Sequence, residues 1–271
     1  RAGLRTREPA NSLPSKSHRM HLATANTREI GMVLKQTKTS VAVLTLAIDI
    51  GGTGVKLMVL DERGRPICNR LRLPTPEPAT PKAVIAALNR LKVQAPAFDR
   101  VGVGFPGVIK KGTTLTAANL HPAWIGFPLQ ATLEHLWRKP VRVANDGAVQ
   151  GYGAIRNKGV ELVITLGTGM GSALFSDGHL CPGLELGHHP WLKKTYEDYL
   201  GKRGLEKHGR KRWNKFLGMA IEQTAHTFNW DTLYIGGGNS KKVSLEFSHN
   251  IKLISNEDGL LGAVKLWEDQ V

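Results

Sequence analysis

The sequence predicts an α/β fold with duplicated mixed sheets and a central cleft. A strand, a glycine-rich turn and a second strand occupy residues 43–60, and the same unit returns at residues 161–175. Helical patterns follow both units, which is typical of an architecture in which each half forms a sheet covered by helices. We therefore predict two α/β domains, at residues 41–142 and 143–256, with a C-terminal helix at residues 257–271 joined to the first.

The elements of the first half follow from local patterns. Residues 43–50 form an apolar run that predicts a buried strand, and residues 55–60 and 66–73 follow turns, so the three strands form a meander. Apolar residues at helical spacing predict a helix over residues 82–94. A short apolar stretch at residues 100–105, ended by a proline and a glycine, predicts a fourth strand.

The remaining elements are justified in the same way. A proline near the first helical position supports a helix at residues 128–137, and a strand at residues 141–144 follows it. In the second half we predict strands at residues 161–166, 172–175 and 232–235, and helices at residues 195–207, at residues 210–228 and from about residue 257.

Composition limits the class of protein. The chain has 271 residues, 41% of them hydrophobic, which suffices for a substantial core. No apolar run approaches the roughly 20 residues of a membrane-spanning helix, so we expect no membrane partner. Cys68 and Cys181 form no zinc-binding or CxxC spacing, and a reducing cytoplasm is the expected location.

The net charge of +15 is high for an enzyme of metabolism. Residues 1–40 contain eight basic and two acidic residues without apolar periodicity, so we predict a disordered basic segment; an organelle transit peptide would look similar. From residue 41 onward, 29 basic residues stand against 20 acidic ones. Such a surplus, where it is clustered, implies a polyanionic partner.

Two glycine turns are candidate phosphate sites. A glycine turn between strands lets backbone N–H groups approach a phosphate, and each turn also carries a threonine hydroxyl. Neither turn matches a P-loop or a dinucleotide-binding fingerprint, and a plain hairpin turn is the alternative for each. The candidate phosphate-binding residues are Gly51, Gly52, Thr53, Gly54, Lys56, Gly167, Thr168 and Gly169. For Lys56, simple exposure to solvent is the alternative.

Two acidic residues close predicted strands. Asp49 precedes the first turn, where a carboxylate could hold Mg²⁺ through water, or could instead fix its own turn. Asn145 and Asp146 follow the strand at residues 141–144. Asp146 could accept the proton of a sugar hydroxyl in a cleft, or could serve as the N-cap of the next helix.

Two further segments suggest binding. Glu185 and His188 lie in a Gly/Pro-rich loop and could bind neighbouring sugar hydroxyls, or could be loop residues without a role. Residues 202–215 are strongly basic and form either a solvated surface or a groove for a long phosphate chain. At helical spacing, Arg203, Lys207, Arg210 and Lys211 would share one face. The candidate groove residues are Lys202, Arg203, Lys207, Arg210, Lys211 and Arg212.

Together these residues resemble the ROK family of sugar kinases and repressors, over roughly residues 43–271. The segment DIGGTG at residues 49–54 is similar to the family's first phosphate loop, and GTGMG at residues 167–171 to its second. The segment ELGH at residues 185–188 is similar to the family's ExGH sugar motif. The resemblance implies the two-domain actin/hexokinase-like (ribonuclease H-like) fold, Asp146 as catalytic base, Mg²⁺ as cofactor and a homodimer. By the same resemblance the sugar contacts would be Asn119, Asn145, Asp146, Glu185, His188 and Glu197.

One departure from the family pattern is informative. Typical bacterial members carry a CxCGxxGC zinc cluster between the ExGH motif and the later glutamate, but no cysteine lies between His188 and Glu197. We therefore expect no structural zinc. The family's polyphosphate-using glucokinases and glucomannokinases also lack this cluster, which together with residues 202–215 favours polyphosphate as donor.

The resemblance thus implies a glucokinase that transfers a phosphoryl group from polyphosphate, with ATP as a possible second donor, to the 6-hydroxyl of glucose; mannose is left open as an acceptor. One alternative is an ATP-only hexose kinase for glucose, mannose or fructose. A DNA-binding repressor of the family is a distant second, because residues 1–40 lack a helix-turn-helix pattern and Asp146 is retained. No specific nucleic-acid partner is expected.

Overall fold

Two five-stranded mixed sheets form the framework of the structure, a computed structural model that describes residues 42–117, 120–181, 183–254 and 258–268. The first sheet has the strand order β3-β2-β1-β4-β7. Its members are β1 (Thr45–Ile50), β2 (Val55–Leu60), β3 (Leu71–Leu73), β4 (Arg100–Phe105) and β7 (Val141–Asn145). β2 pairs antiparallel with β1 and β3, whereas β1, β4 and β7 are parallel. The predicted disordered segment, residues 1–40, lies outside the described residues.

The second sheet repeats this arrangement strand for strand, in the order β10-β9-β8-β13-β14. Its members are β8 (Val160–Leu166), β9 (Met170–Ser176), β10 (His179–Leu180), β13 (Thr232–Gly236) and β14 (Ile251–Leu253). Again the first hairpin is antiparallel, and two parallel strands follow it. The predicted duplication of mixed sheets is therefore confirmed.

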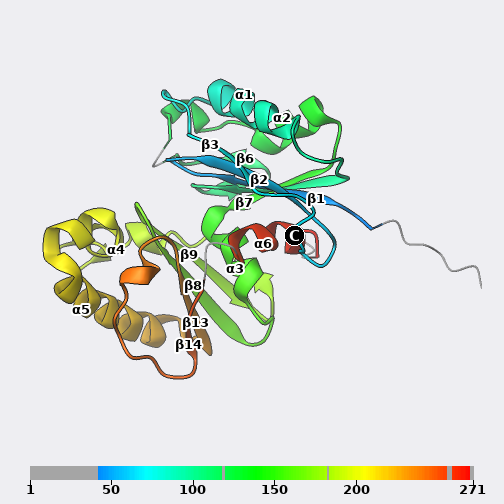
Figure 1. The fold of residues 1–271 in the computed structure, drawn as a ribbon. Coiled ribbons are helices and arrows are strands. Elements are labelled where there is room, and N and C mark those ends of the chain that lie inside the picture. Colours follow the sequence, from blue (N-terminus) through cyan, green and yellow to red (C-terminus); the bar gives the residue numbers. More distant parts are fainter. Residues whose placement is uncertain (1–41, 118–119, 182, 255–257, 269–271) are drawn as a thin grey trace, which may run out of the picture. The chain divides into compact units, whose positions relative to one another are not determined.

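Helices separate and cover the sheets (Figure 1). α1 (Pro81–Lys92) and α2 (Leu129–Trp137) cover one face of the first sheet. α3 (Asp146–Ala154) and α6 (Asp258–Lys265) lie between the two sheets. α4 (Tyr196–Leu200) and α5 (Lys202–Phe228) cover the other face of the second sheet. The short elements are η1 (Pro122–Trp124), η2 (Leu186–His188), η3 (Ser240–Lys242) and the hairpins β5 (Ile109–Lys110)–β6 (Thr113–Thr114) and β11 (Pro190–Trp191)–β12 (Lys194–Thr195).

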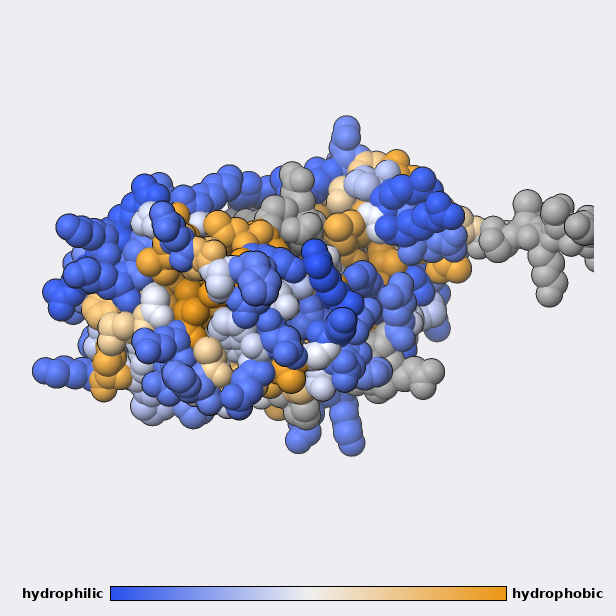
Figure 2. Space-filling model, turned by 90° about the horizontal axis from the view of Figure 1, so that it is seen from below, coloured by the Kyte–Doolittle hydropathy of each residue, from blue (hydrophilic) through white to orange (hydrophobic). Residues whose placement is uncertain are grey.

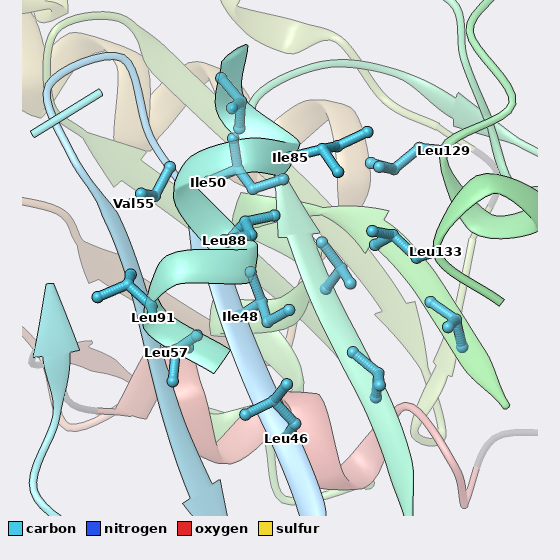
Figure 3. Packing of buried hydrophobic residues seen from close by; sticks show 14 of the residues in the cluster. Leu46, Ile48, Ile50, Val55, Leu57, Ile85, Leu88, Leu91, Leu129 and Leu133 are labelled. Carbon is cyan, nitrogen blue, oxygen red and sulfur yellow. The ribbon is translucent and has the colours of Figure 1, made fainter. Parts of the chain in front are cut away.

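The side-chain alternation of β1 explains why its sequence is apolar throughout. Leu46, Ile48 and Ile50 pack into the cluster beneath α1 and α2, where Ile85 and Leu88 also lie (Figure 3). The intervening Ala47 packs into a second cluster, with α3 and α6. Because successive side chains point to opposite faces of a strand, a strand covered on both faces needs apolar residues at nearly every position.

The close approach of α6 to its neighbours depends on glycine. A Cβ added at Gly262 would lie 1.6 Å from the carbonyl oxygen of Val149 in α3. A Cβ at Gly102 in β4 would lie 2.4 Å from the carbonyl oxygen of Ala263. Both positions require the absence of a side chain, and so the C-terminal helix can pack between the sheets.

The structure confirms most predicted elements and corrects some boundaries. β2 and β4 have the predicted bounds. The strand predicted over residues 66–73 is reduced to β3 and an isolated bridge between Leu60 and Pro66, and between these two the Val59 N–H donates to the Cys68 sulfur. The predicted break near residue 209 is present, since Gly209 has φ +70° within α5. A further break at Gly201, between α4 and α5, was not predicted.

The predicted domain division stays a prediction, and residues 41–271 form one compact unit. β7 continues to Asn145, three residues beyond the predicted boundary, because its pairing with β4 extends from Val141 to Asn145. Within the described ranges, no helix combines the length and the apolar character needed to cross a bilayer. On the face seen in Figure 2, hydrophilic side chains predominate and hydrophobic ones gather in patches between them.

Candidate active site

A cavity of about 740 Å³ lies where the two glycine turns and the start of α3 meet. Residues of both sheets line it. Of the predicted site residues, those lining the cavity are Asp49, Gly51, Gly52, Thr53, Lys56, Asn145, Asp146, Gly167, Thr168, Gly169, Glu185, His188 and Glu197. The structure therefore brings together residues from segments that are far apart in the sequence.

The two glycine turns occupy equivalent positions in the two sheets. The first joins β1 to β2 after the pair Ile50–Val55, and the second joins β8 to β9 after the pair Leu166–Met170. Each turn closes on itself through one backbone hydrogen bond, of 3.0 Å in both cases. Gly54 differs from its predicted partners: it is buried and does not line the cavity. Its backbone lies against Arg72.

Asp49 and Lys56 form an ion pair beside the first turn. The Lys56 Nζ donates to Asp49 Oδ2 over 2.6 Å, and both side chains are about one-third exposed, at 31% and 34%. The pairing follows from register, because Asp49 and Lys56 are directly opposite each other in the β1–β2 hairpin. Lys56 is thus held at the cavity by a carboxylate, and no bond from the Asp49 side chain to its own turn is seen among the described residues.

Asn145, not Asp146, is the N-cap of α3, which corrects the alternative considered for Asp146. The Asn145 Oδ1 accepts hydrogen bonds from the N–H groups of Gly147 and Ala148, at 2.9 and 3.3 Å. The Asn145 Nδ2 donates to the Gly107 carbonyl. Asp146 is therefore the first residue of the helix. Capping by Asn145 fixes the backbone on which the Asp146 carboxylate is presented to the cavity.

The Asp146 carboxylate has properties suited to a general base. Burial, followed by the charges of Asp49 and Glu185, raises its pKa to about 7. The Gly147 N–H donates to its Oδ1 over 2.8 Å and lowers the pKa, an effect smaller than those of burial and of the Asp49 charge. A carboxyl whose pKa lies near neutrality can both accept and release a proton at physiological pH.

Glu185 and His188 face each other at the same cavity. η2 brings the His188 Nε2 to 3.7 Å from the Glu185 Oε2. Burial raises the pKa of Glu185, the charge of His188 lowers it, and the charge of Glu197 raises it again. The pair therefore offers a carboxylate and an imidazole close together, as a polyol ligand would require.

Glu197 connects α4 to the second glycine turn. Its Oε2 accepts a hydrogen bond of 3.0 Å from the Met170 N–H. A Cβ added at Gly169 would lie 2.2 Å from the same oxygen, so a side chain there would displace the Glu197 carboxylate. α4 is itself fixed by a capping box between Thr195 and Asp198. Glu197 thus lines the cavity and also holds the turn that closes it.

Other predicted site residues lie elsewhere. Asn119 falls outside the described residues. The six candidate groove residues of α5 are exposed, and none of them lines the cavity. The helical spacing that would place Arg203, Lys207, Arg210 and Lys211 on one face does not continue through Gly209, which has a left-handed φ.

Several residues that line the cavity were not predicted from the sequence. They are Arg70, Thr116, Gln150, Thr165, Ser240 and Lys241. Thr165 could have been found from its place two residues before the second turn. Ser240 and Lys241 follow the Gly236–Gly238 turn closely, so a glycine turn after a strand was the available signal.

No preformed cluster of metal ligands is seen in the part of the chain that the structure describes. There, no group of three or more His, Cys, Asp or Glu side chains could hold a metal ion. Asp49 and Asp146 nevertheless line one cavity, and the charge of Asp49 raises the pKa of Asp146. Two carboxylates that disfavour each other's charge suit a hard divalent cation, which also takes oxygen ligands from water and phosphate.

Comparison with known proteins agrees with this geometry. The chain is 34% identical over 207 residues to the polyphosphate glucokinase of Mycobacterium tuberculosis (strain CDC 1551 / Oshkosh), covering 72% of this chain and 78% of that protein. It is similar to the inorganic polyphosphate/ATP-glucomannokinase from Arthrobacter sp. strain KM, with a TM-score of 0.76 and 33% identity, over 83% of this chain and 98% of that chain.

A more distant structure shares the fold. The ROK family glucokinase from Streptomyces griseus in complex with glucose and AMPPNP has a TM-score of 0.70 at 21% identity, over 82% of this chain and 98% of that chain. The predicted actin/hexokinase-like architecture is thereby confirmed. The sequence model described as "ROK family" matches residues 45–206. The chain therefore belongs to the ROK family.

Proposed function

We propose that this protein is a glucokinase that transfers a phosphoryl group from inorganic polyphosphate, or from ATP, to the 6-hydroxyl of glucose. The observation that carries the proposal is the single cavity in which a carboxyl with a pKa of about 7 faces both glycine turns and the Glu185–His188 pair. The similarity to a polyphosphate glucokinase and to a polyphosphate/ATP-glucomannokinase supports the choice of substrates.

In this mechanism Asp146 accepts the proton of the 6-hydroxyl. As the proton moves to the carboxylate, the hydroxyl oxygen forms a bond to the terminal phosphorus, and the bond from that phosphorus to the bridging oxygen of the donor breaks. The sugar is oriented by Glu185, His188 and Glu197. Asn145 has an amide hydrogen left for the sugar after its bond to Gly107.

The glycine turns hold the transferring group. Backbone N–H groups and the hydroxyls of Thr53 and Thr168 supply donors at the cavity, and Lys56 supplies a positive charge. Asp49 would hold Mg²⁺ through water. When bound, Mg²⁺ would neutralise charge on the phosphoryl group.

We further propose that the basic residues of α5 guide a polyphosphate chain toward the cavity. The backbone N–H of Lys202 donates to the carbonyls of Gly167 and Thr168, at 2.9 and 3.2 Å, so α5 begins directly against the second turn. Replacing Lys207 and Lys211 by glutamine should raise the KM for polyphosphate and leave the KM for ATP unchanged. Equal effects on both donors would contradict a dedicated groove.

The primary test is glucose 6-phosphate formation by the purified protein with Mg²⁺, supplied with long-chain polyphosphate or with ATP. Faster turnover on polyphosphate is the expected result. Turnover on ATP alone would keep the sugar-kinase function and remove the role of α5. The absence of product with both donors, repeated with mannose and fructose, would overturn the proposal. A homodimer and the use of mannose are proposed from the family resemblance, and sedimentation and acceptor comparison test them.

A further inference from the structure

The cavity has a wall that the mechanism does not use. Residues Gly237, Ser240 and Lys241, which follow β13, line it together with the catalytic carboxylate and both turns. Lys241 is exposed, and the structure gives its ammonium group no acidic partner among the described residues. Lys56 in the same cavity is paired with Asp49. Lys241 is thus a lysine of the cavity whose charge remains available to a ligand.

The backbone that carries Lys241 is fixed to the second glycine turn. The Asn239 N–H donates to the Leu166 carbonyl over 2.8 Å, and the Asn239 Nδ2 donates to the Gly167 carbonyl over 2.9 Å. Gly237 has φ +85°, and a Cβ there would lie 2.4 Å from the Leu166 carbonyl oxygen. The backbone of Lys241 is therefore positioned by the glycine turn that we assign to phosphate binding.

The same backbone is also fixed from the side of α5. The Lys242 carbonyl accepts hydrogen bonds from Arg210 Nε over 2.9 Å and from Asn214 Nδ2 over 3.1 Å. The Asn214 Oδ1 accepts one from the Ser244 N–H over 2.8 Å. Arg210 directly follows Gly209, the residue at which the helical backbone of α5 is interrupted. η3 is thus held between the second turn and α5.

The distribution of charge indicates what Lys241 binds. Asp146, Glu185 and Glu197 make the acceptor end of the cavity acidic, which suits an uncharged sugar and repels a polyanion. An unpaired ammonium and a hydroxyl beside a phosphate-binding turn suit an anion with several negatively charged oxygens. The transferred phosphoryl group must lie near Asp146, so the part of the donor available to Lys241 is the part that is not transferred.

Resting on the function proposed above, we infer that Lys241, with Ser240, binds the phosphoanhydride chain of the donor beyond the transferred phosphate. Of the six candidate groove residues of α5, Arg210 is then assigned another role: it positions η3 and does not itself bind the chain. The chemistry recognised, a linear chain of phosphates, is shared by polyphosphate and by the triphosphate of ATP.

The test compares Lys241→Gln with Lys242→Gln, a matched control that removes the same charge one residue away, outside the cavity lining. Donor KM, glucose KM and kcat are measured with long-chain polyphosphate, tripolyphosphate and ATP. We expect Lys241→Gln to raise the donor KM about tenfold through loss of a charge-assisted contact, with glucose KM and kcat within about twofold of wild type. Lys242→Gln should change the donor KM by less than about twofold.

The donors then distinguish the source of the phosphate chain. A rise in KM for all three donors supports recognition of a short phosphate chain, and a rise for polyphosphate alone supports recognition of the longer polymer. Equal KM values for the two variants, or a change confined to the glucose KM, would overturn the inference.

A binding measurement separates this inference from the proposed function. Long-chain polyphosphate is titrated into wild type and both variants without glucose. If wild type phosphorylates no sugar but binds polyphosphate about tenfold more tightly than Lys241→Gln does, the proposed function fails and the inference stands. If wild type is active and Lys241→Gln binds polyphosphate as Lys242→Gln does, the inference fails alone.

The role of Arg210 is tested by a double-mutant cycle. Arg210→Ala should raise the donor KM in wild type and should have little further effect in Lys241→Gln, because both act through the same contact. Additive effects would show that Arg210 binds the donor itself, and would overturn its assignment as a positioning residue.

Discussion

The two glycine turns occupy equivalent positions in two sheets of the same strand order, but the side chains around them differ. The first carries its own charges, because the register of β1 and β2 places Asp49 opposite Lys56. At the position equivalent to Asp49, β8 has Thr165, also two residues before its turn. The second turn is instead held by Glu197 and Asn239, which come from α4 and from the segment after β13.

This difference shows how a duplicated framework acquires two roles. Backbone topology repeats because it depends on local patterns of strands and turns, whereas the side chains around each turn are supplied by different long-range contacts. The first turn is therefore suited to binding a metal ion and a charged group. The second turn is suited to linking the sugar-binding segment to the bound phosphate. The predictions below test that division, beginning with the largest expected effect.

Asp146 is delivered at the end of β7, the last strand of the first sheet, and its loss should have the largest effect. Asp146→Asn keeps the shape and removes the proton acceptor, so turnover should fall by about 10²–10⁴. Steady-state kinetics with saturating glucose and donor measure this. Near-normal turnover would exclude Asp146 as the base.

Thermal unfolding supplies the control for Asp146→Asn. Because burial raises the pKa of Asp146, its ionised form lowers the stability of the folded state increasingly as pH rises from about 4 to about 7, and fully above that. At pH 8 the variant should therefore unfold at the same temperature as wild type or at a higher one. A lower unfolding temperature would mean that the variant loses activity through misfolding.

Breaking the support of the second turn should have the next largest effect. Glu197→Ala leaves the Met170 N–H without its acceptor and removes a predicted sugar contact. We expect a fall in kcat/KM of about tenfold to a hundredfold for glucose with either donor. Glu222→Ala, at an exposed position of α5, is the control and should behave as wild type. An effect limited to the glucose KM would separate sugar binding from support of the turn.

The pH profile tests the charge of the first turn. Since the pKa of Asp146 is about 7, kcat/KM should rise as pH increases through 7 and then level off, and at pH 6 it should be about one-tenth of its plateau. Asp49→Asn removes a charge that raises this pKa, so the rise should move to lower pH. An unmoved profile would contradict the coupling. His188→Gln should leave the rise in place, and its disappearance would assign it to the imidazole.

The smallest effect concerns the interruption of α5 at Gly209, directly before Arg210. Gly209 has φ +70° and ψ 160°, a conformation that is strained for any other residue. Gly209→Ala should lower the free energy of unfolding by about 1–3 kcal/mol. Gly218→Ala, within the regular part of the same helix and with only Leu245 nearby, should raise it by about 0.5–1 kcal/mol. Equal changes in denaturant midpoint would contradict the assigned strain.

The sequence by itself determined the duplicated sheets, the two turns and many of the polar residues that line the cavity. β2 is a short, mainly apolar run that follows Gly54, and β4 is one that ends before Pro106, so their bounds depend on neighbours in the chain. The motifs at residues 49–54, 145–146, 167–171 and 185–188 were equally visible, because the chemistry they imply is carried by adjacent residues.

Only the tertiary structure decided how these residues work on each other. The ion pair of Asp49 and Lys56 depends on strand register, and the pKa of Asp146 depends on burial and on the charges of Asp49 and Glu185, which lie in two other segments. The position of Lys241 depends on hydrogen bonds from Asn239 and Arg210, which are long-range contacts. Burial and Coulomb interactions depend on distances in space, and local sequence patterns do not determine those distances.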